Sequence, residues 1–460
     1  MRTSGAPIPA FPQREPDTRL IRRLIWGYFW LWFAEGAIRK WLLPQYSGYL
    51  LLVRDPLVVW IYFLAFFRLR FRPLWPWLVT GVFFVVMGLE GAFSPVRNPL
   101  VALYGLRTNL LHVPMIFIIG QVLTYEDVSK AARYALGLTF PLVAIAVAQF
   151  YSPLGSFINA GAGMDSGQLE GALGHVRPPS VFSFNGGYVA FLNLTLVFAL
   201  EDLMVQQGRR LLFAASAFAV LMVGFAVSVS RAAVLGGAIT LAVFMLTSAR
   251  NRGFGRFLAI LYCIPAALAS LSFLGVVHDG MFAFAERWTG STSDLHTTVY
   301  ESIVLRIWHT FTDFFQLLGR TPPAGYGVGL GTNAGAYLTT GDLDFLLAEN
   351  EFERIILEVG PIVGLAYILF RFAIAGAIGA VVVRAFRRRN PRPWCLFSVS
   401  AVTVLIGQWG VATIQGATVL LAGLTLASAH PNFYRGIPFS PPGRPRWIGS
   451  RNEPEEVVAP

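Results

Sequence analysis

Apolar stretches of about 20 residues recur along almost the whole chain, and this pattern restricts the fold more than any other feature. A helix needs about 20 apolar residues to cross the hydrocarbon core of a bilayer, which is roughly 30 Å thick. Only 13% of the 460 residues are charged and 55% are hydrophobic, whereas soluble domains are about one quarter charged. No ten-residue alternation of apolar and polar residues repeats, which argues against an outer-membrane barrel. The sequence therefore predicts an all-α, polytopic membrane protein.

Twelve transmembrane helices are predicted. Their ranges are 22–42, 47–67, 74–93, 99–120, 134–152, 181–200, 211–229, 231–248, 257–277, 352–383, 395–412 and 414–430. The first range follows Arg19, Arg22 and Arg23 as a signal peptide would, but it has no clear A-x-A cleavage site, so we expect it to be retained. The resulting organisation is a tail (1–20), nine helices (21–277) with an outside loop near 153–180, a large outside loop (278–351), three helices (352–430) and a second tail (431–460).

Basic residues predict the orientation. The net charge is +11, and twenty-four of the thirty-six basic residues lie in the two tails and in alternate segments between the apolar ranges. The positive-inside rule places these segments and both termini in the cytoplasm. Because the charge lies in short loops of a membrane protein, we expect the lipid bilayer and not nucleic acid as the partner of these basic residues. The two long loops then lie on the opposite side.

The large loop 278–351 is expected to be folded, with an amphipathic helix over 299–318. One face of this helix carries Val299, Ile303, Ile307, Phe311, Phe314, Phe315 and Leu318 at helical spacing. Beside it runs a polar stripe of Ser302, Arg306, His309 and Asp313. Such a helix can lie in the membrane interface with its Phe side in the lipid, which would hold Arg306 and His309 just above the headgroups.

Three polar clusters share the predicted outside location. They are 174–180 with Arg177, 228–231 with Arg231, and a third in and after the large loop. The third is made of Arg306, the Gly-rich segment 325–331 with Tyr326, Glu349 with Asn350, and Glu353, Arg354 and Glu358. Arginine suits phosphate because its planar guanidinium binds oxygens bidentately and stays charged. Two or three such groups would form a site for a lipid-linked phosphate or diphosphate. A nearby carboxylate or histidine could accept a proton from an attacking hydroxyl.

Each cluster also has a structural interpretation. Arg177 can pair with a lipid headgroup, and Arg231 can anchor its turn at the interface. The Gly-rich segment lacks the Gly-Lys-Ser/Thr ending of a phosphate loop, so tight turns and close backbone packing also explain it. Asn350 with Glu353 fits a capping box at a helix start.

No metal site and no cofactor are expected. His175, His296 and His309 lack metal-ligand spacing, and the two cysteines, Cys263 and Cys395, form neither a cluster nor a disulfide framework. The rings of Trp288, Trp308 and Tyr326 can stack on sugars or pack within the protein.

The order of five short motifs carries a family resemblance. They are 35–41 (Glu-Gly-Ala-Ile-Arg-Lys-Trp), Val176-Arg177-Pro178 with Phe182 and Asn185, Ser230-Arg231-Ala232-Ala233, Arg306-Ile307-Trp308 followed by 325–331, and Glu349-Asn350 followed by Leu357-Glu358-Val359-Gly360. In this order the chain resembles the O-antigen ligase and O-antigen polymerase superfamily of bacterial membrane glycosyltransferases. The resemblance covers roughly residues 35–365.

The resemblance implies an inner-membrane enzyme that moves an undecaprenyl-diphosphate-linked glycan to a sugar hydroxyl in the periplasm. The acceptor is the lipid A core for ligases and another glycan for polymerases. Arg177 and Arg306 would bind the diphosphate, Glu349 would be the catalytic base, and Arg231, His309, Asn350 and Tyr326 would contact substrate. Many ligases have His where this chain has Glu349, which favours a polymerase or another glycan transferase over a ligase and leaves His309 as an alternative base.

Two other functions remain open. Twelve helices with both ends inside also suit a secondary transporter, for which Arg107 and Asn109 in the fourth predicted helix are the best indication. The halves of the chain show no clear repeat, and the conspicuous polar residues gather at the outside edge. A non-catalytic partner in polysaccharide export is the third possibility. The sequence alone does not distinguish ligase from polymerase or identify the sugar.

Overall fold

The computed structural model describes most of the chain between residues 18 and 429. The described ranges are 18–69, 74–95, 98–163, 171–249, 254–271, 273, 275–295, 299–341, 347–348 and 350–429. Inside them, the side chains of 249, 265–269, 271, 290–295, 299, 300, 302, 303 and 306 lie outside the description. Glu349 and nearly all of the two predicted tails also lie outside the described residues.

All regular elements in these ranges are helices, which confirms the predicted all-α fold. They are α1 (Arg19–Ala37), η1 (Ile38–Leu42), η2 (Pro44–Tyr46), α2 (Ser47–Leu50), α3 (Asp55–Arg68), α4 (Trp75–Phe93), α5 (Pro99–Leu106), η3 (Arg107–Leu111), α6 (Val113–Val122), α7 (Tyr125–Tyr151), η4 (Phe157–Asn159), α8 (Asn185–Val205), α9 (Gly208–Val227), α10 (Arg231–Ala249), α11 (Phe254–Leu271), α12 (Gly275–Leu295), α13 (Val299–Thr312), α14 (Phe314–Leu317), α15 (Asn333–Thr340), α16 (Glu351–Arg387), α17 (Arg392–Ile406) and α18 (Ala412–Ser428). Helices η1 and η3 are π-helical turns, and η2 and η4 are 3₁₀ turns.

Eight helices in the described ranges are long and apolar enough to cross a membrane. They are Pro44–Arg68, Trp75–Phe93, Pro99–Val122, Tyr125–Tyr151, Asn185–Val205, Gly208–Val227, Arg231–Ser248 and Glu351–Arg387. Helices α17, α18 and the described part of α11 are apolar but shorter. Each predicted membrane range coincides with helix over most of its length, while the total of twelve crossings stays a prediction.

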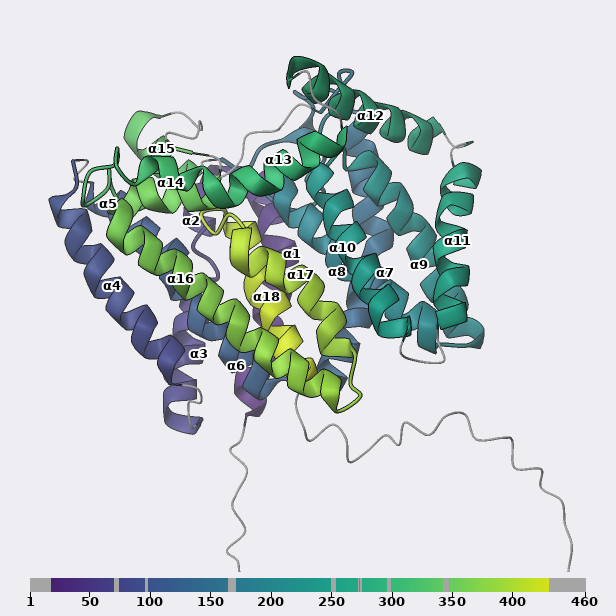
Figure 1. Ribbon diagram of the computed structural model, residues 1–460, viewed down its shortest axis with the longest axis horizontal. Coiled ribbons are helices and arrows are strands. Elements are labelled where there is room, and N and C mark those ends of the chain that lie inside the picture. The colour runs from purple at the N-terminus through teal and green to yellow at the C-terminus, as the bar shows by residue number, and fades with distance from the viewer. Residues whose placement is uncertain are drawn as a thin grey trace, which may run out of the picture.

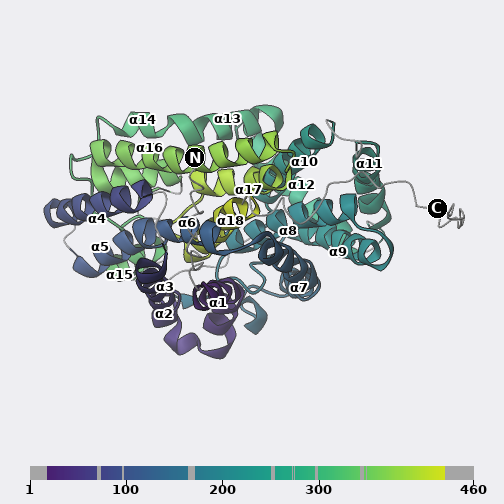
Figure 2. The same ribbon diagram turned by 90° about the horizontal axis from the view of Figure 1, so that it is seen from below.

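The helices form a bundle around α18. Helix α18 packs against α1, α6, α8, α16 and α17, and Figure 2 shows it inside the bundle with these helices around it. Its side chains are almost all buried. Helix α18 is thus the short, mostly apolar and almost fully buried helix around which the others pack.

One end of the bundle holds both ends of the described chain, and we call it the terminal end. There Arg22 of α1 lies 3.5 Å from Asp127 near the start of α7, and Asn390 donates to the Ser428 carbonyl at the end of α18 at 2.9 Å. We call the opposite end the loop end. Figure 1 shows α12, α13, α14 and α15 there, lying across the direction of the upright helices.

Helix α12 is fastened to the loop end by polar contacts. The Tyr151 hydroxyl at the end of α7 donates to Asp279 at 2.8 Å, and Arg287 donates to the Val229 carbonyl in the turn between α9 and α10. The hydrogen bonds from Tyr151 and His278 lower the pKa of the Asp279 carboxyl. The predicted turn at 228–231 is thus present, and α12 lies against it.

The predicted amphipathic helix 299–318 is two helices, because α13 ends at Thr312 and α14 begins at Phe314. Part of its phenylalanine face packs against the protein. Phe314 is buried against Phe352 and Ile356 of α16, while Trp308 is 65% exposed. Part of the apolar face therefore packs on the bundle, which the periodicity of the sequence alone does not reveal.

A backbone contact joins the Gly-rich segment 325–331 to α5. Gly329 has φ of +85°, and a Cβ added there would overlap the Val101 carbonyl and Gly105. A Cβ added at Gly105 would likewise overlap the backbone of Val328 and Gly329. Only glycine permits this approach and this backbone conformation without strain.

We predict that Gly329→Ala lowers the free energy of unfolding by about 2 kcal/mol or more, because the methyl group overlaps backbone atoms that cannot rotate away. Gly137→Ala in α7 is the matched control, since no atom lies within 4 Å of an added Cβ there. The measurement is thermal unfolding of the purified protein in detergent, followed by tryptophan fluorescence. Equal melting temperatures for the two variants would contradict the described contact.

Candidate functional site

Two carboxylates and two arginines form a buried ionic group in α16. Arg354 lies 2.9 Å from Glu351 and 2.7 Å from Glu358, and Arg371 lies 2.5 Å from Glu351. All four side chains are at least 95% buried. Arg354 also donates to the Asn109 side chain of η3 at 2.9 Å. Because each charge has a partner of opposite sign, the group can exist inside an apolar bundle.

Helix α16 is interrupted within this group, between Glu358 and Arg371. Gly360 has φ of 77° and ψ of 168°, and Pro361 follows it. A break leaves carbonyls of the preceding turn without helical partners. The Gly-rich segment supplies these partners, since the Tyr326 amide donates to the Leu357 carbonyl at 2.7 Å and the Gly327 amide donates to the Glu358 carbonyl at 3.1 Å.

The same segment binds the Glu358 carboxylate. The amides of Gly329 and Gly331 donate to its two oxygens at 3.1 and 3.0 Å. The Gly-rich segment thus uses its amides on a carboxylate of its own chain and on the helix break. Its structural interpretation, close backbone packing, is confirmed.

A second buried ionic group centres on Glu35 near the end of α1. Glu35 forms an ion pair with Arg54 at 2.6 Å and accepts a hydrogen bond from Arg39 at 3.3 Å. Arg39 also donates to the Ala162 carbonyl at 2.8 Å, and Arg54 donates to the Ala412 carbonyl at 2.6 Å. These contacts tie α1, the start of α3 and the start of α18 together at the loop end.

Asp55, next to Arg54 in the sequence, anchors a third set of contacts. Arg107 of η3 grips its carboxylate with two hydrogen bonds of 2.8 and 2.9 Å. The His112 ring lies between Asp55 and Tyr28, 3.0 Å from an oxygen of each. The π-helical turn η3 therefore presents Arg107 to α3 and Asn109 to α16.

The segment 407–416 joins these groups. The Trp409 amide donates to Glu351 at 3.2 Å, and its ring lies under Arg371 at 4.2 Å. Gln415 donates to the Thr108 carbonyl of η3, and Gly416 lies against the Arg54 guanidinium. The three sets of charges thus form one connected structure, which we call the ionic core.

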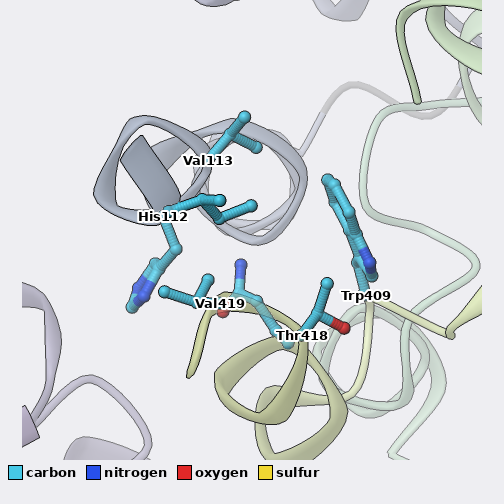
Figure 3. A pocket seen from close by; sticks show the side chains of 7 residues that line it. His112, Val113, Trp409, Thr418 and Val419 are labelled. Atoms are coloured by element: carbon cyan, nitrogen blue, oxygen red, sulfur yellow. The ribbon is translucent and has the colours of Figure 1, made fainter. Parts of the chain in front are cut away.

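A small cavity lies beside the ionic core. It is lined by His112, Val113, Ile116, Trp409, Gln415, Thr418 and Val419, from α6, α18 and the segment before α18 (Figure 3). It offers about 10 Å³ for the centre of a water molecule, close to the minimum for a single water. This space is far too small for a glycan or a lipid headgroup.

The ionic core carries more positive than negative groups. Its basic side chains are Arg39, Arg54, Arg107, Arg354 and Arg371, and its carboxylates are Glu35, Asp55, Glu351 and Glu358. Within the core the basic side chains thus outnumber the carboxylates by one. An anionic ligand is the complement that a local surplus of positive charge favours.

Arg177 lies in a loop that packs on the ionic core. This loop, 171–185, follows α7 and ends at the start of α8, and Arg177 is half-buried within it. Its guanidinium lies 3.5 Å from the Asn185 side chain. His175 stacks on Phe150 with ring centroids 4.0 Å apart. The loop is therefore firmly placed on both sides of Arg177.

The other predicted substrate residues lie at several places. Arg231 begins α10, donates to the Arg287 carbonyl at 3.0 Å and lies 5.7 Å from the Trp288 ring, so it helps to fasten α12. His309 is exposed on α13, 2.7 Å from Asp313. Tyr326 is half-buried in the Gly-rich segment.

The start of α16 is predicted correctly, but the capping box is wrong. Asn350 is the residue before the first helical position, and its side chain caps no backbone amide. It donates instead to Glu353 at 3.4 Å. Glu349, the predicted base directly before it, lies outside the described residues.

Arg306 lies in α13, and its side chain is outside the description. Figure 2 shows α13 along the edge of the bundle beside α16, whereas α1 and α7, which hold the Arg177 loop, lie toward the opposite edge. Among the described residues, Arg177 contacts Asn185, and its loop contacts η1 through Lys40 and α7 through Gln149. A joint site of Arg177 and Arg306 stays a prediction.

Arg107, Asn109 and the 35–41 motif, which the sequence analysis identified, belong to the ionic core. Four further members were not predicted from the sequence: Arg54, Asp55, Glu351 and Arg371. A signal was present, because ionisable residues inside predicted apolar ranges are costly and are kept for a reason.

Within the described part of the chain, no three His, Cys, Asp or Glu side chains are grouped so that they could hold a metal ion. No family model matches the sequence, and no curated protein matches it.

We predict that Arg354→Gln lowers the free energy of unfolding by about 3–5 kcal/mol, because it leaves buried carboxylates without their counter-charge. Arg388→Gln, at an exposed position of the terminal end, is the control and should unfold like the natural protein. Thermal unfolding in detergent tests both variants. A melting temperature of Arg354→Gln equal to that of the control would show that the ionic core does not stabilise the fold.

Proposed function

We propose that the protein is a glycan transferase of the bacterial inner membrane that uses an undecaprenyl-diphosphate-linked donor, in the manner of O-antigen ligases and polymerases. One observation carries the proposal: a half-buried arginine, Arg177, stands on a rigid loop above a buried core with surplus positive charge. A diphosphate is the anionic group on such a donor, and arginine binds it with charge-assisted hydrogen bonds. The motif order described above supplies the link to glycan transfer.

The proposed membrane layout has twelve crossings with both termini in the cytoplasm and the loop end in the periplasm. The basic residues of the short loops support it, since Arg133, Arg209, Arg210, Arg256 and Arg384 all lie in elements that meet at the terminal end. On this layout α12–α15 belong to the periplasmic loop 278–351. The donor's isoprenoid tail would then remain in the outer leaflet while its diphosphate reaches the loop end.

The proposed chemistry is a single displacement at the anomeric carbon of the donor sugar. The acceptor hydroxyl oxygen forms the new bond, and the bond from the anomeric carbon to the diphosphate oxygen breaks. Arg177 and Arg306 neutralise the departing diphosphate, and Glu349 accepts the hydroxyl proton. The products are the lengthened or attached glycan and undecaprenyl diphosphate.

Secondary transport is the second candidate, and one observation favours it. Arg107 and Asn109 lie in a π-helical turn within a predicted crossing and connect Asp55 of α3 to Arg354 of α16. π-turns and buried charges often mark functional sites in membrane helices. A transporter, however, does not require an arginine on a fixed loop at one end of the bundle.

We predict that Arg177→Ala lowers transfer at least about 100-fold, since it removes charge-assisted hydrogen bonds to the diphosphate. Arg177→Lys should recover only part of the activity, because it keeps the charge but loses the bidentate geometry. Arg320→Ala, at an exposed position after α14, is the control. The measurement is the glycan profile of a deletion strain complemented with each variant at equal membrane level.

The deletion strain itself distinguishes the activities. Loss of long chains with single units still attached indicates a polymerase, and loss of all attached glycan indicates a ligase. A normal glycan profile with Arg177→Ala and with Arg306→Ala would exclude the proposed site. A normal profile in the deletion strain, together with loss of uptake or export of a solute, would favour transport.

A further inference from the structure

Lys40 is a buried lysine that contacts the Arg177 loop. It lies in η1 and is 1% exposed. Its ammonium group donates to the Ser180 carbonyl and, at 2.8 Å, to the Phe182 carbonyl. It also lies 4.5 Å from the Trp41 ring. These two carbonyls stand three and five positions after Arg177, on the same loop.

Ser180 is fastened from a second side by α7. The Gln149 side chain accepts from the Ser180 amide at 2.7 Å and donates to the Ser180 carbonyl at 3.1 Å. The Ser180 hydroxyl donates to the Leu142 carbonyl at 2.7 Å. Ser180 has φ of +53°, a left-handed conformation that costs a non-glycine residue free energy. Contacts on several sides are what holds a residue in such a conformation.

Gly36 allows the loop to reach Lys40. A Cβ added at Gly36 would overlap the Val181 carbonyl and the Ser183 amide. The backbone of 181–183 therefore lies directly on α1, one turn before Lys40. The motif 35–41 thus has two parts, since Glu35 and Arg39 belong to the ion pairs of the core and Gly36 and Lys40 receive the Arg177 loop.

Burying an ammonium group is a costly way to fasten a loop. A neutral donor such as Gln149 makes similar bonds to Ser180 without the cost of removing a charge from water, which reaches several kcal/mol. In the described structure Lys40 has carbonyls and an aromatic face as neighbours and no carboxylate within ion-pair distance.

We propose that Lys40 is a positioning residue for Arg177: it holds the 177–182 backbone so that the Arg177 guanidinium faces an incoming diphosphate. This inference rests on the proposed function, in which Arg177 binds that diphosphate. Lys40 itself does not touch the ligand, because it is buried beneath the loop.

The test measures binding of undecaprenyl diphosphate, added in detergent micelles, to the purified full-length protein. Lys40→Met keeps the length of the side chain and removes its charge and donors, and binding should weaken about tenfold. Lys130→Met is the matched control, since Lys130 is the only other lysine in the chain and is exposed on α7; it should bind like the natural protein.

A double variant separates positioning from a general structural role. If Lys40 acts through Arg177, then Lys40→Met combined with Arg177→Ala should bind no more weakly than Arg177→Ala alone. A further loss in the double variant, or unchanged binding by Lys40→Met, would overturn the proposal. Unchanged binding by Arg177→Ala would instead overturn the proposed function.

Gln149→Met provides the same test if Lys40→Met does not fold. It removes two of the bonds that fasten Ser180 from α7 and leaves the charge of Lys40 in place. It should weaken binding in the natural background and have no further effect with Arg177→Ala. Binding equal to that of the natural protein would show that the position of the loop does not matter.

Discussion

Pairing of buried charges is the constraint on which the rest of the structure depends. A lone arginine or glutamate in an apolar bundle costs several kcal/mol, whereas a well-paired one is tolerated. Glu35 serves both Arg39 and Arg54, and Glu351 serves both Arg354 and Arg371. Ion pairs join α1 to the start of α3 and α3 to η3. Hydrogen bonds from Arg354 to Asn109 and from the Trp409 amide to Glu351 join α16 to η3 and to the segment before α18. These helices therefore cannot shift at the loop end without breaking contacts of buried charges. The ionic core thus fixes the positions of the loops that pack on it.

The irregular turns of the bundle lie next to the ionic core and position its side chains. The π-turn η3 directs Arg107 to Asp55 and Asn109 to Arg354. The break of α16 at Gly360 frees carbonyls that the Gly-rich segment then satisfies. Backbone without a helical partner is costly in a membrane unless protein covers it. The break of α16 is covered in this way by the Gly-rich segment, which gains a fixed position from that role.

The sequence predicts the helices well and the core poorly, for physical reasons. The length of an apolar range can be read from the sequence. Helices such as Trp75–Phe93, and the start of α16 after Asn350, are therefore predicted from composition and spacing. Pairing across the bundle, such as Arg354 with Asn109, depends on which helices are neighbours, and spacing does not reveal that. The break between α13 and α14 at Asp313 is not predicted, because the helical spacing of apolar residues continues on both sides of it. Of the candidate site, the loop with Arg177 and the turn with Arg231 are where the sequence places loops, while the role of the Gly-rich segment needed the structure.

We propose that the ionic core presents Arg177 to an anionic lipid carrier at the loop end. A cryo-EM map of the protein in a nanodisc with undecaprenyl diphosphate tests this directly. We expect diphosphate density within hydrogen-bonding distance of the Arg177 guanidinium, with the loop still fastened to Lys40 and Gln149. Diphosphate bound elsewhere, or an Arg177 side chain that points into the acyl chains with no ligand beside it, would show that Arg177 does not bind the carrier.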